Sequence, residues 1–423
     1  MKARKVMLST AAGAAIMLQS IIAFADPVPG LSLDDSVALA LKNNPTIKMA
    51  VDDQQKAEGA IAEAEAGRAP TLSIGAGANR AEGAGQAVPG TSYNSSLKMN
   101  WTLYSGGRIE GLVDQAKLNA KSSDLGVDKA REQIKLDATT AYYGVLQAGD
   151  MVAVNNEAVD SLTQHLKTVK AQFDSGVIAK ADLLRSEVEL ANAQQNLTKA
   201  QNAFEIAKSN LNNVIGAPLD TQQILNNQLT HTDFDSTLDD CIAYALNNRP
   251  EIQQSQNGIE VAEKGVEIAK SGNRPTVTFG ATDGWSGNEF PGQTNNWSMN
   301  VMANWNVFDA GLTNAKVNQN KAVSAKAKDQ DTQLRGNIEL EVRQNYMNMR
   351  EAEERLQTTQ VAANKAEEDL KIAKTKYYAG VGTNLDVIDA QLALTQAKTN
   401  HTQALYDYNV NMAKLEKSMG IKV

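Results

Sequence analysis

The chain has 423 residues and a formal net charge of −8, and only 5% of its residues are aromatic. The length suffices for two or three ordinary domains. So few large apolar side chains are poor material for several compact cores, however, and the composition favours long helices that pack small side chains. The negative charge argues against a nucleic-acid partner. The single cysteine, Cys241, excludes a disulfide framework and a cysteine metal cluster.

Residues 1–25 are predicted to be a secretory signal peptide. Lys2, Arg4 and Lys5 form a basic start, an apolar stretch follows, and the sequence AFA before Asp26 is a small-x-small cleavage site. The alternative is a membrane anchor, which is disfavoured because polar residues interrupt the apolar stretch. Removal of the three basic residues takes the formal net charge from −8 to −11. Beyond this segment, no run reaches the roughly 18 apolar residues of a membrane helix.

The rest of the chain contains two similar halves. Four pairs of phrases match: LDDSVALALKNNP with LDDCIAYALNNRP, RAPTLSIGA with NRPTVTFGA, NWTLYSGGR with NWNVFDAGL, and QFDSGVIAKADLL with KYYAGVGTNLDVI. All four keep an offset of 204 or 205 residues, which indicates a tandem duplication. We therefore predict repeat 1 at 26–216, a linker rich in Gln, Asn, Thr and Asp at 217–236, and repeat 2 at 237–423.

Each repeat is predicted to contain the same elements in the same order. A helix comes first, at about 33–66 and 238–271. A strand pair follows, at about 70–104 and about 275–308. A long helical hairpin ends each repeat, at 106–215 with a break at Gly176, and at 310–418 with a break at Gly380.

The long helices carry a seven-residue apolar pattern. Small or branched apolar side chains recur along 113–173 at a and d positions, which is typical of coiled-coil packing. At about 1.5 Å per residue, a helix of this length spans about 100 Å. The pattern alone is compatible with an ordinary coiled coil. The predicted strands are therefore needed to distinguish a simple coiled-coil rod from a more specific fold.

The strands alternate between apolar and polar residues. In SLKMNWTLY (96–104) and WSMNVMANWNV (297–307), one face carries Trp, Met, Leu and Val and the other carries Ser, Asn, Lys and Thr. A soluble sheet packed on the helices is one explanation. A transmembrane β-strand set, with Trp101, Tyr104, Trp297, Trp305 and Phe308 at the membrane interfaces, fits better because the second face is polar enough to line water. Four strands cannot close a barrel, so the barrel would be shared between chains.

These features together resemble the TolC-like outer membrane factors over nearly the whole mature chain. The resemblance rests on the repeat, the LDD openings, the strand-to-helix transition NWTLYSGGR and the turns around GVIAKADLL and GVGTNLDVIDAQLAL. It implies a mixed α/β membrane protein: a homotrimer whose 12-stranded outer-membrane β-barrel, four strands per chain, continues into a long α-helical coiled-coil periplasmic tunnel. It also implies a periplasmic adaptor, an inner-membrane transporter and contact with outer membrane lipid. Because no cysteine directly follows the signal peptide, the chain resembles the members of this family that carry no lipid anchor.

The two hairpin turns are predicted to form the periplasmic tip. Gly176 and Gly380 permit the reversal because glycine tolerates positive φ. By resemblance, Gly176–Val177 and Gly380–Val381 match the turns that meet the adaptor. Asp182 and Tyr377 match a gating pair that bonds one hairpin to the other, although Asp182 is equally suited to cap the helix that it begins.

A second gating contact of the family is missing here. The family often has an arginine two residues after the turn glycine, where this sequence has Gly382, and the partner position is Ala181. We therefore expect the closed tip to be held by fewer bonds, or by different ones.

Asp386 and Asp389 lie three residues apart, on one helical face, just after the second turn. They could belong to a solvated helix face near a helix N-terminus. By resemblance, they match the aspartates of the tunnel constriction. Three chains would then place six carboxylates around a narrow pore, with mutual repulsion that raises some pKa values and a preference for cations.

Two other functions were weighed. An enzyme is disfavoured because the histidines, His165, His231 and His401, lie in predicted helices or the linker, and no catalytic motif, metal site or cofactor site is evident. A trimeric outer-membrane tether or adhesin-like stalk is the closer alternative. The paired strands between hairpins and the paired aspartates favour a passive exit duct of an efflux pump or type I secretion system, with conductance as the discriminating property.

Overall fold

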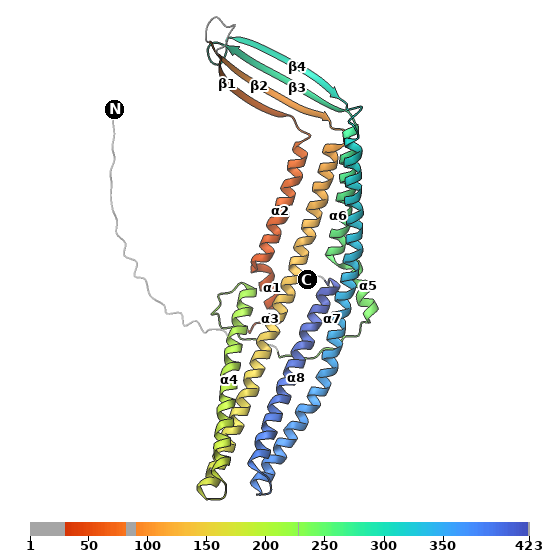
Figure 1. Cartoon of the computed structure of the whole chain (residues 1–423). Coiled ribbons are helices and arrows are strands. Elements are labelled where there is room, and N and C mark those ends of the chain that lie inside the picture. Colours follow the sequence, from red (N-terminus) through yellow and green to blue (C-terminus); the bar gives the residue numbers. More distant parts are fainter. Residues whose placement is uncertain (1–29, 82–89, 227, 422–423) are drawn as a thin grey trace, which may run out of the picture.

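Figure 1 shows the computed structural model, which describes residues 30–81, 90–226 and 228–421. A four-stranded sheet stands at one end of the molecule, and two long helical hairpins extend away from it. Shorter helices lie beside the hairpins between the sheet and mid-height. The order helix, helix, strand, strand, helix, helix occurs twice along the chain. The predicted signal peptide, 1–25, lies outside the described residues.

The first helix predicted in each half is in fact two helices. These are α1 (Leu33–Asn43) with α2 (Pro45–Ala66), and α5 (Leu238–Asn248) with α6 (Pro250–Lys270), which a short 3₁₀ turn at Ser271–Asn273 follows. The prediction of one continuous helix was wrong because Asn44 and Arg249 precede prolines, which disfavour helical backbone in the residue before them. Both residues are extended, with ψ of 128° and 130°. Asn44 also caps α2, since its side chain accepts from the Thr46 N–H.

The sheet joins the two halves of the chain. Its strands are β1 (Thr71–Ala81), β2 (Gly90–Tyr104), β3 (Thr276–Gly287) and β4 (Thr294–Asn304), in the order β1-β2-β3-β4, and every neighbouring pair is antiparallel. The first-half strand β2 pairs with the second-half strand β3. β4 ends before Trp305 and Phe308, so these two predicted strand-end aromatics lie on the connection to the next helix.

The register places most of the apolar residues of the four strands on one face. Leu72, Met99, Ala281 and Met299 are aligned across the sheet, as are Trp101, Phe279 and Val301. The other face carries polar rows such as Ser73, Lys98, Thr282 and Ser298. The alternation predicted from the sequence therefore runs through both halves with exceptions such as these: Asp283 lies in the apolar row of Leu97 and Trp297, and Met302 lies on the polar face. The apolar face is open in the single chain, where Ile74 is 84% exposed and Trp297 is 71% exposed.

The two hairpins match the predicted boundaries within a few residues. They consist of α3 (Arg108–Asp174) with α4 (Lys180–Ile215), and α7 (Leu312–Tyr378) with α8 (Asn384–Met419). The 67 residues of α3 and of α7 span about 100 Å. The predicted seam of α3 is buried at Val113, Val127, Ile134, Ala148, Leu162 and Val169. Within the described residues, no helix combines the length and the apolarity needed to cross a membrane.

Two apolar cores hold the helices together at mid-height. One contains Ala40, Ile134, Tyr142 and Leu211 of the first half. The other is centred on Val342, Tyr408 and Leu415 of the second half, and the single cysteine, Cys241, is buried in it. The linker crosses between them and is pinned by a parallel bridge between Leu31 and Leu225. Each half therefore builds its own core, and the linker connects the two.

Candidate functional site: the hairpin tips and the sheet

The two hairpin turns have nearly the same backbone. Gly176 and Gly380 have φ of 77° and 76°, in the left-handed region that favours glycine. A Cβ added at either glycine would meet no atom within 4 Å, so the backbone angle, and not space, demands glycine. The next residues, Val177 and Val381, are 72% and 76% exposed at the end of the molecule opposite the sheet. The predicted docking turns therefore present apolar side chains to the outside.

The helices that leave these turns are capped differently. Thr383 caps α8: its hydroxyl accepts from the Asp386 N–H, and its own N–H donates to Asp386 Oδ2 at 2.8 Å. The corresponding residue at α4 is Ala179, which makes no side-chain cap. Asp182 is the third residue of α4 and does not occupy the capping position. The reciprocal capping box is thus present at only one of the two tips.

Asp386 and Asp389 are both exposed, while Val387, Ile388 and Ala390 between and beside them are buried. The two carboxylates therefore point away from the packed core of their own chain. Bonds from the N–H and hydroxyl of Thr383 lower the pKa of Asp386 in the single chain. The rise expected from a ring of carboxylates needs the neighbouring chains and stays a prediction.

The predicted gating residues lie close to each other but use other partners. The Tyr377 hydroxyl donates to Gln172 Oε1 of α3 at 2.5 Å. Burial, with the nearby charge of Asp182, raises the pKa of Tyr377, so the hydroxyl stays a donor. The backbone oxygen of Asp182 accepts from Asn384 Nδ2 at 3.0 Å. Both residues thus join one hairpin to the other, although through Gln172 and Asn384.

Asn384 is the centre of a buried polar cluster that the sequence did not reveal. Its Oδ1 lies 2.6 Å from His165 Nε2 of α3 and 3.1 Å from Ser186 Oγ of α4. Because the Asn384 amide nitrogen donates to Asp182, the oxygen is the acceptor and His165 carries its hydrogen on Nε2. All three side chains are 4% exposed or less. The His165 ring also packs edge-on against Tyr377, with centroids 5.0 Å apart.

This cluster is the lowest of several contacts between α3 and α8. Above it, Ser161 Oγ donates to Gln391 Oε1, Lys398 Nζ pairs with Glu157 at 2.7 Å, and Gln147 donates to Gln403 at 2.6 Å. Near the tip, Val169, Leu370, Tyr377, Val387 and Leu394 form an apolar cluster from α3, α7 and α8. The second hairpin is therefore fastened to the first by both polar and apolar contacts.

The predicted interface aromatics lie at both ends of the sheet. At the helix end, Trp101 Nε1 donates to the Arg68 carbonyl at 2.8 Å, and Trp305 Nε1 donates to the Asn273 carbonyl at 3.0 Å. Tyr104 and Phe308, also at this end, are 45% and 88% exposed. Trp297 lies near the opposite end of β4. Trp305 follows Trp297 by eight positions, which corresponds to about 26 Å of extended chain.

Comparison with known proteins identifies the family. The sequence model of the outer membrane efflux protein family matches this chain twice, at residues 37–217 and 241–421. Among curated proteins, the chain is 22% identical to outer membrane protein TolC of Salmonella enteritidis over 391 residues, which cover 89% of this chain and 79% of that protein. It is 23% identical to the alkaline protease secretion protein AprF of Pseudomonas aeruginosa over 434 residues, covering 97% and 87%.

Solved structures show the same fold. The Campylobacter jejuni outer membrane channel CmeC superposes with a TM-score of 0.81 at 18% identity, covering 92% of this chain and 85% of that one. A structure of CusC gives a TM-score of 0.81 at 16% identity, covering 92% of both chains. The chain belongs to the outer membrane efflux protein family, and it is an outer membrane protein that extends into the periplasm.

Proposed function

We propose that the protein is the exit duct of a tripartite efflux pump or of a type I secretion system. Three copies would share one 12-stranded barrel in the outer membrane, and their hairpins would form a tunnel through the periplasm. The duct is passive and performs no enzymatic reaction. An adaptor and an inner-membrane transporter open it at the periplasmic tip.

The observation that carries this proposal is the form of the sheet. Its face of Leu, Met, Val and Trp is exposed in the single chain, and its opposite face is polar. β1 and β4 stand at the two edges, so each has one side without a strand partner among the described residues. Lipid-facing strands must have their backbone groups paired, and a barrel of at least about eight strands meets this need. Copies of the same chain, joined edge to edge, would supply the missing strands.

The tip supports the transport part of the proposal. Asp386 and Asp389 are exposed one turn after the hairpin reversal, at the far end of helices about 100 Å long. In a ring of three chains, they would form an acidic constriction that selects cations and that multivalent cations block. Val177 and Val381 would offer apolar contacts to an adaptor. Its relatives include both an outer membrane protein of a solvent efflux pump and an alkaline protease secretion protein, which supports either type of transporter.

Single-channel conductance in a planar bilayer tests the proposal. The purified wild type should give small, cation-selective currents that a trivalent cation blocks when added on the tip side. The double variant Asp386→Ala/Asp389→Ala should lose this block. Asp174→Ala is the matched control, because it removes an exposed carboxylate from the other tip, and it should stay blockable.

Each failure points to a different error. If the wild type conducts under no condition, the duct is wrong and the tether or stalk becomes the better function. If the double variant conducts but is blocked as strongly as the wild type, the duct stands and the acidic constriction lies elsewhere.

A further inference from the structure

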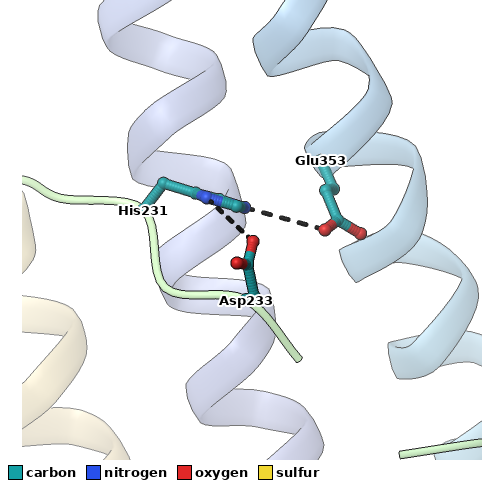
Figure 2. Close-up of side chains that lie close together, drawn as sticks. All are labelled: His231, Asp233 and Glu353. Carbon is teal, nitrogen blue, oxygen red and sulfur yellow. Dashed lines mark ion pairs between the residues drawn. The ribbon is translucent and has the colours of Figure 1, made fainter. Parts of the chain in front are cut away.

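Three side chains with metal-ligating atoms meet at mid-height, far from the tip. Figure 2 shows His231 and Asp233 of the linker opposite Glu353 of α7. His231 Nδ1 lies 3.5 Å from Asp233 Oδ1, and His231 Nε2 lies 3.7 Å from Glu353 Oε1. One ligand atom from each of the three residues lies within 4.8 Å of the other two. We propose that they bind a divalent transition-metal ion, such as Zn²⁺, which fastens the linker to α7.

The chemistry of the three ligands selects the class of ion. An imidazole nitrogen suits zinc and its neighbours in the transition series, whereas an all-oxygen site would suit magnesium or calcium. Bonds of about 2.0–2.2 Å in a tetrahedral zinc site place neighbouring ligand atoms about 3.3 Å apart. The ion takes only one of the two imidazole nitrogens, so only one of the two separations, 3.5 Å at Nδ1 or 3.7 Å at Nε2, is a distance between two ligands of that ion. The remaining ligand atom lies within 4.8 Å of the other two and must move inward when the ion binds. One ring nitrogen and two carboxylate oxygens would provide three ligands, and water would complete the fourth position.

The imidazole is held in place before any ion binds. Its ring packs on Tyr408 of α8, with centroids 4.6 Å apart. The Tyr408 hydroxyl in turn donates to the backbone oxygen of Thr232, the residue between the two linker ligands. This anchor fixes the short segment 231–233 against the helices. A ligand that is already oriented loses less freedom when it binds an ion.

The remaining ligands combine a fixed carboxylate with a movable one. Glu353 is fixed, because Arg350 binds its Oε2 at 2.8 Å and leaves Oε1 directed at His231. The Asp233 side chain is 83% exposed on a segment without regular structure. The Asp233 carboxylate can therefore rotate toward an ion that His231 and Glu353 hold. Among the described residues, Arg350 is the one cation paired with a ligand of the site, so its charge should weaken the binding of the ion.

The test is zinc binding to the full-length protein in detergent, purified without a histidine tag. Isothermal titration with ZnCl₂ should show a site that MgCl₂ does not fill. His231→Gln should weaken that site by about 100-fold, since it removes the only nitrogen ligand. Asp233→Asn should also weaken it. Arg350→Gln should tighten it, which a purely structural ion-pair cluster would not explain.

Two matched controls separate this site from others. Asp235→Asn makes the same change two residues away in the linker, and His401→Gln removes a histidine from the middle of α8; both should bind zinc as the wild type does. The zinc-induced rise in unfolding temperature should vanish in His231→Gln, even if this variant is less stable without metal. If the wild type binds no zinc, or if His231→Gln binds it equally well, the proposal is overturned.

Discussion

The tips of the two hairpins share a backbone but are stabilised by different side chains. Both turn through a glycine with φ close to 77° and expose a valine at the next position. The second tip has the Thr383–Asp386 capping box and contributes Asn384 to the buried cluster. At the equivalent positions, the first tip has Ala179, without a side-chain cap, and the exposed Lys180. The two turns therefore share a backbone shape, but at these equivalent positions only the second turn places a side chain, Asn384, in contact with the other hairpin.

The largest expected effect comes from removing Asn384. Asn384→Ala leaves the buried His165 N–H without its acceptor, whereas the Asp182 carbonyl still accepts from the Ser186 hydroxyl. An unsatisfied buried group costs about 1–3 kcal/mol, so the second tip should lose about 2 kcal/mol. Hydrogen exchange at residues 380–395 should accelerate about 30-fold. Lys180→Ala, the matched change in the first tip, should stay within about 0.5 kcal/mol of wild type, and an equal loss at both sites would refute the asymmetry.

The glycine substitutions test what the two tips share. Gly176→Ala and Gly380→Ala each force a side chain into left-handed backbone, which costs about 1–2 kcal/mol. Because neither site has a neighbour within 4 Å of an added Cβ, the two costs should be equal. Denaturant unfolding of the two variants measures them. A clear difference between the two would mean that the backbone of the turns is not equivalent in solution.

Of the two tips, the second should depend more strongly on pH. Burial lowers the pKa of His165, and nearby Lys374 adds to this effect. The stability that depends on neutral His165 is therefore complete above about pH 6.5, the ordinary value, and is lost as the pH falls through the folded pKa. The loss is at most about 1.4 kcal/mol per pH unit.

Hydrogen exchange at the two tips between pH 7 and pH 5 provides the comparison. Residues 380–395 should lose protection as the pH falls, after correction for the intrinsic exchange rate, and residues 176–190 should lose less. His165→Gln keeps an N–H donor but does not titrate, so it should remove the difference. A difference that persists in this variant would assign the effect to another group.

The smallest effect concerns the caps. Thr383→Ala removes a cap worth about 1 kcal/mol. Ala179→Thr should add a similar amount at the first tip, because Asp182 already stands at the third helical position that completes a capping box. Unfolding midpoints of the two single variants and of the double variant measure both changes. If Ala179→Thr brings no gain, the packing around residue 179 does not admit the capping side chain.

Regular patterns made most of the fold predictable. The seven-residue repeat of α3 and the glycines at 176 and 380 placed both hairpins within a few residues. The start of β2 was placed at residue 96, although the strand begins at Gly90. Residues 90–95 lack apolar alternation, and what holds them is backbone pairing with β1 and β3, which side-chain patterns do not report.

The site was predictable only where its residues are neighbours in the sequence. Asp386 and Asp389 stand out because three residues separate them, and the exposed positions of Val177 and Val381 follow from the turns. His165 and Asn384 are 219 residues apart, and their meeting depends on how α3 and α8 are rotated against each other. The missing arginine at Gly382 predicts fewer bonds or different ones at the closed tip, and this stays a prediction because it concerns the assembled chains. Within the single chain, Tyr377 bonds to Gln172 and Asp182 bonds to Asn384.

The pairing of β2 with β3 sets a condition on the biosynthesis of the protein. The central seam of the sheet joins Tyr93–Tyr104 to Val277–Gly287, so it closes only after both hairpin helices of the first half and the linker have been exported. Contacts between such distant segments form slowly, because a long loop must close first. Until then, β1 and β2 lack the neighbouring strands β3 and β4 that complete the sheet. The first half therefore exposes its apolar strands for the longest time, and the sheet is complete only after β3 has been exported.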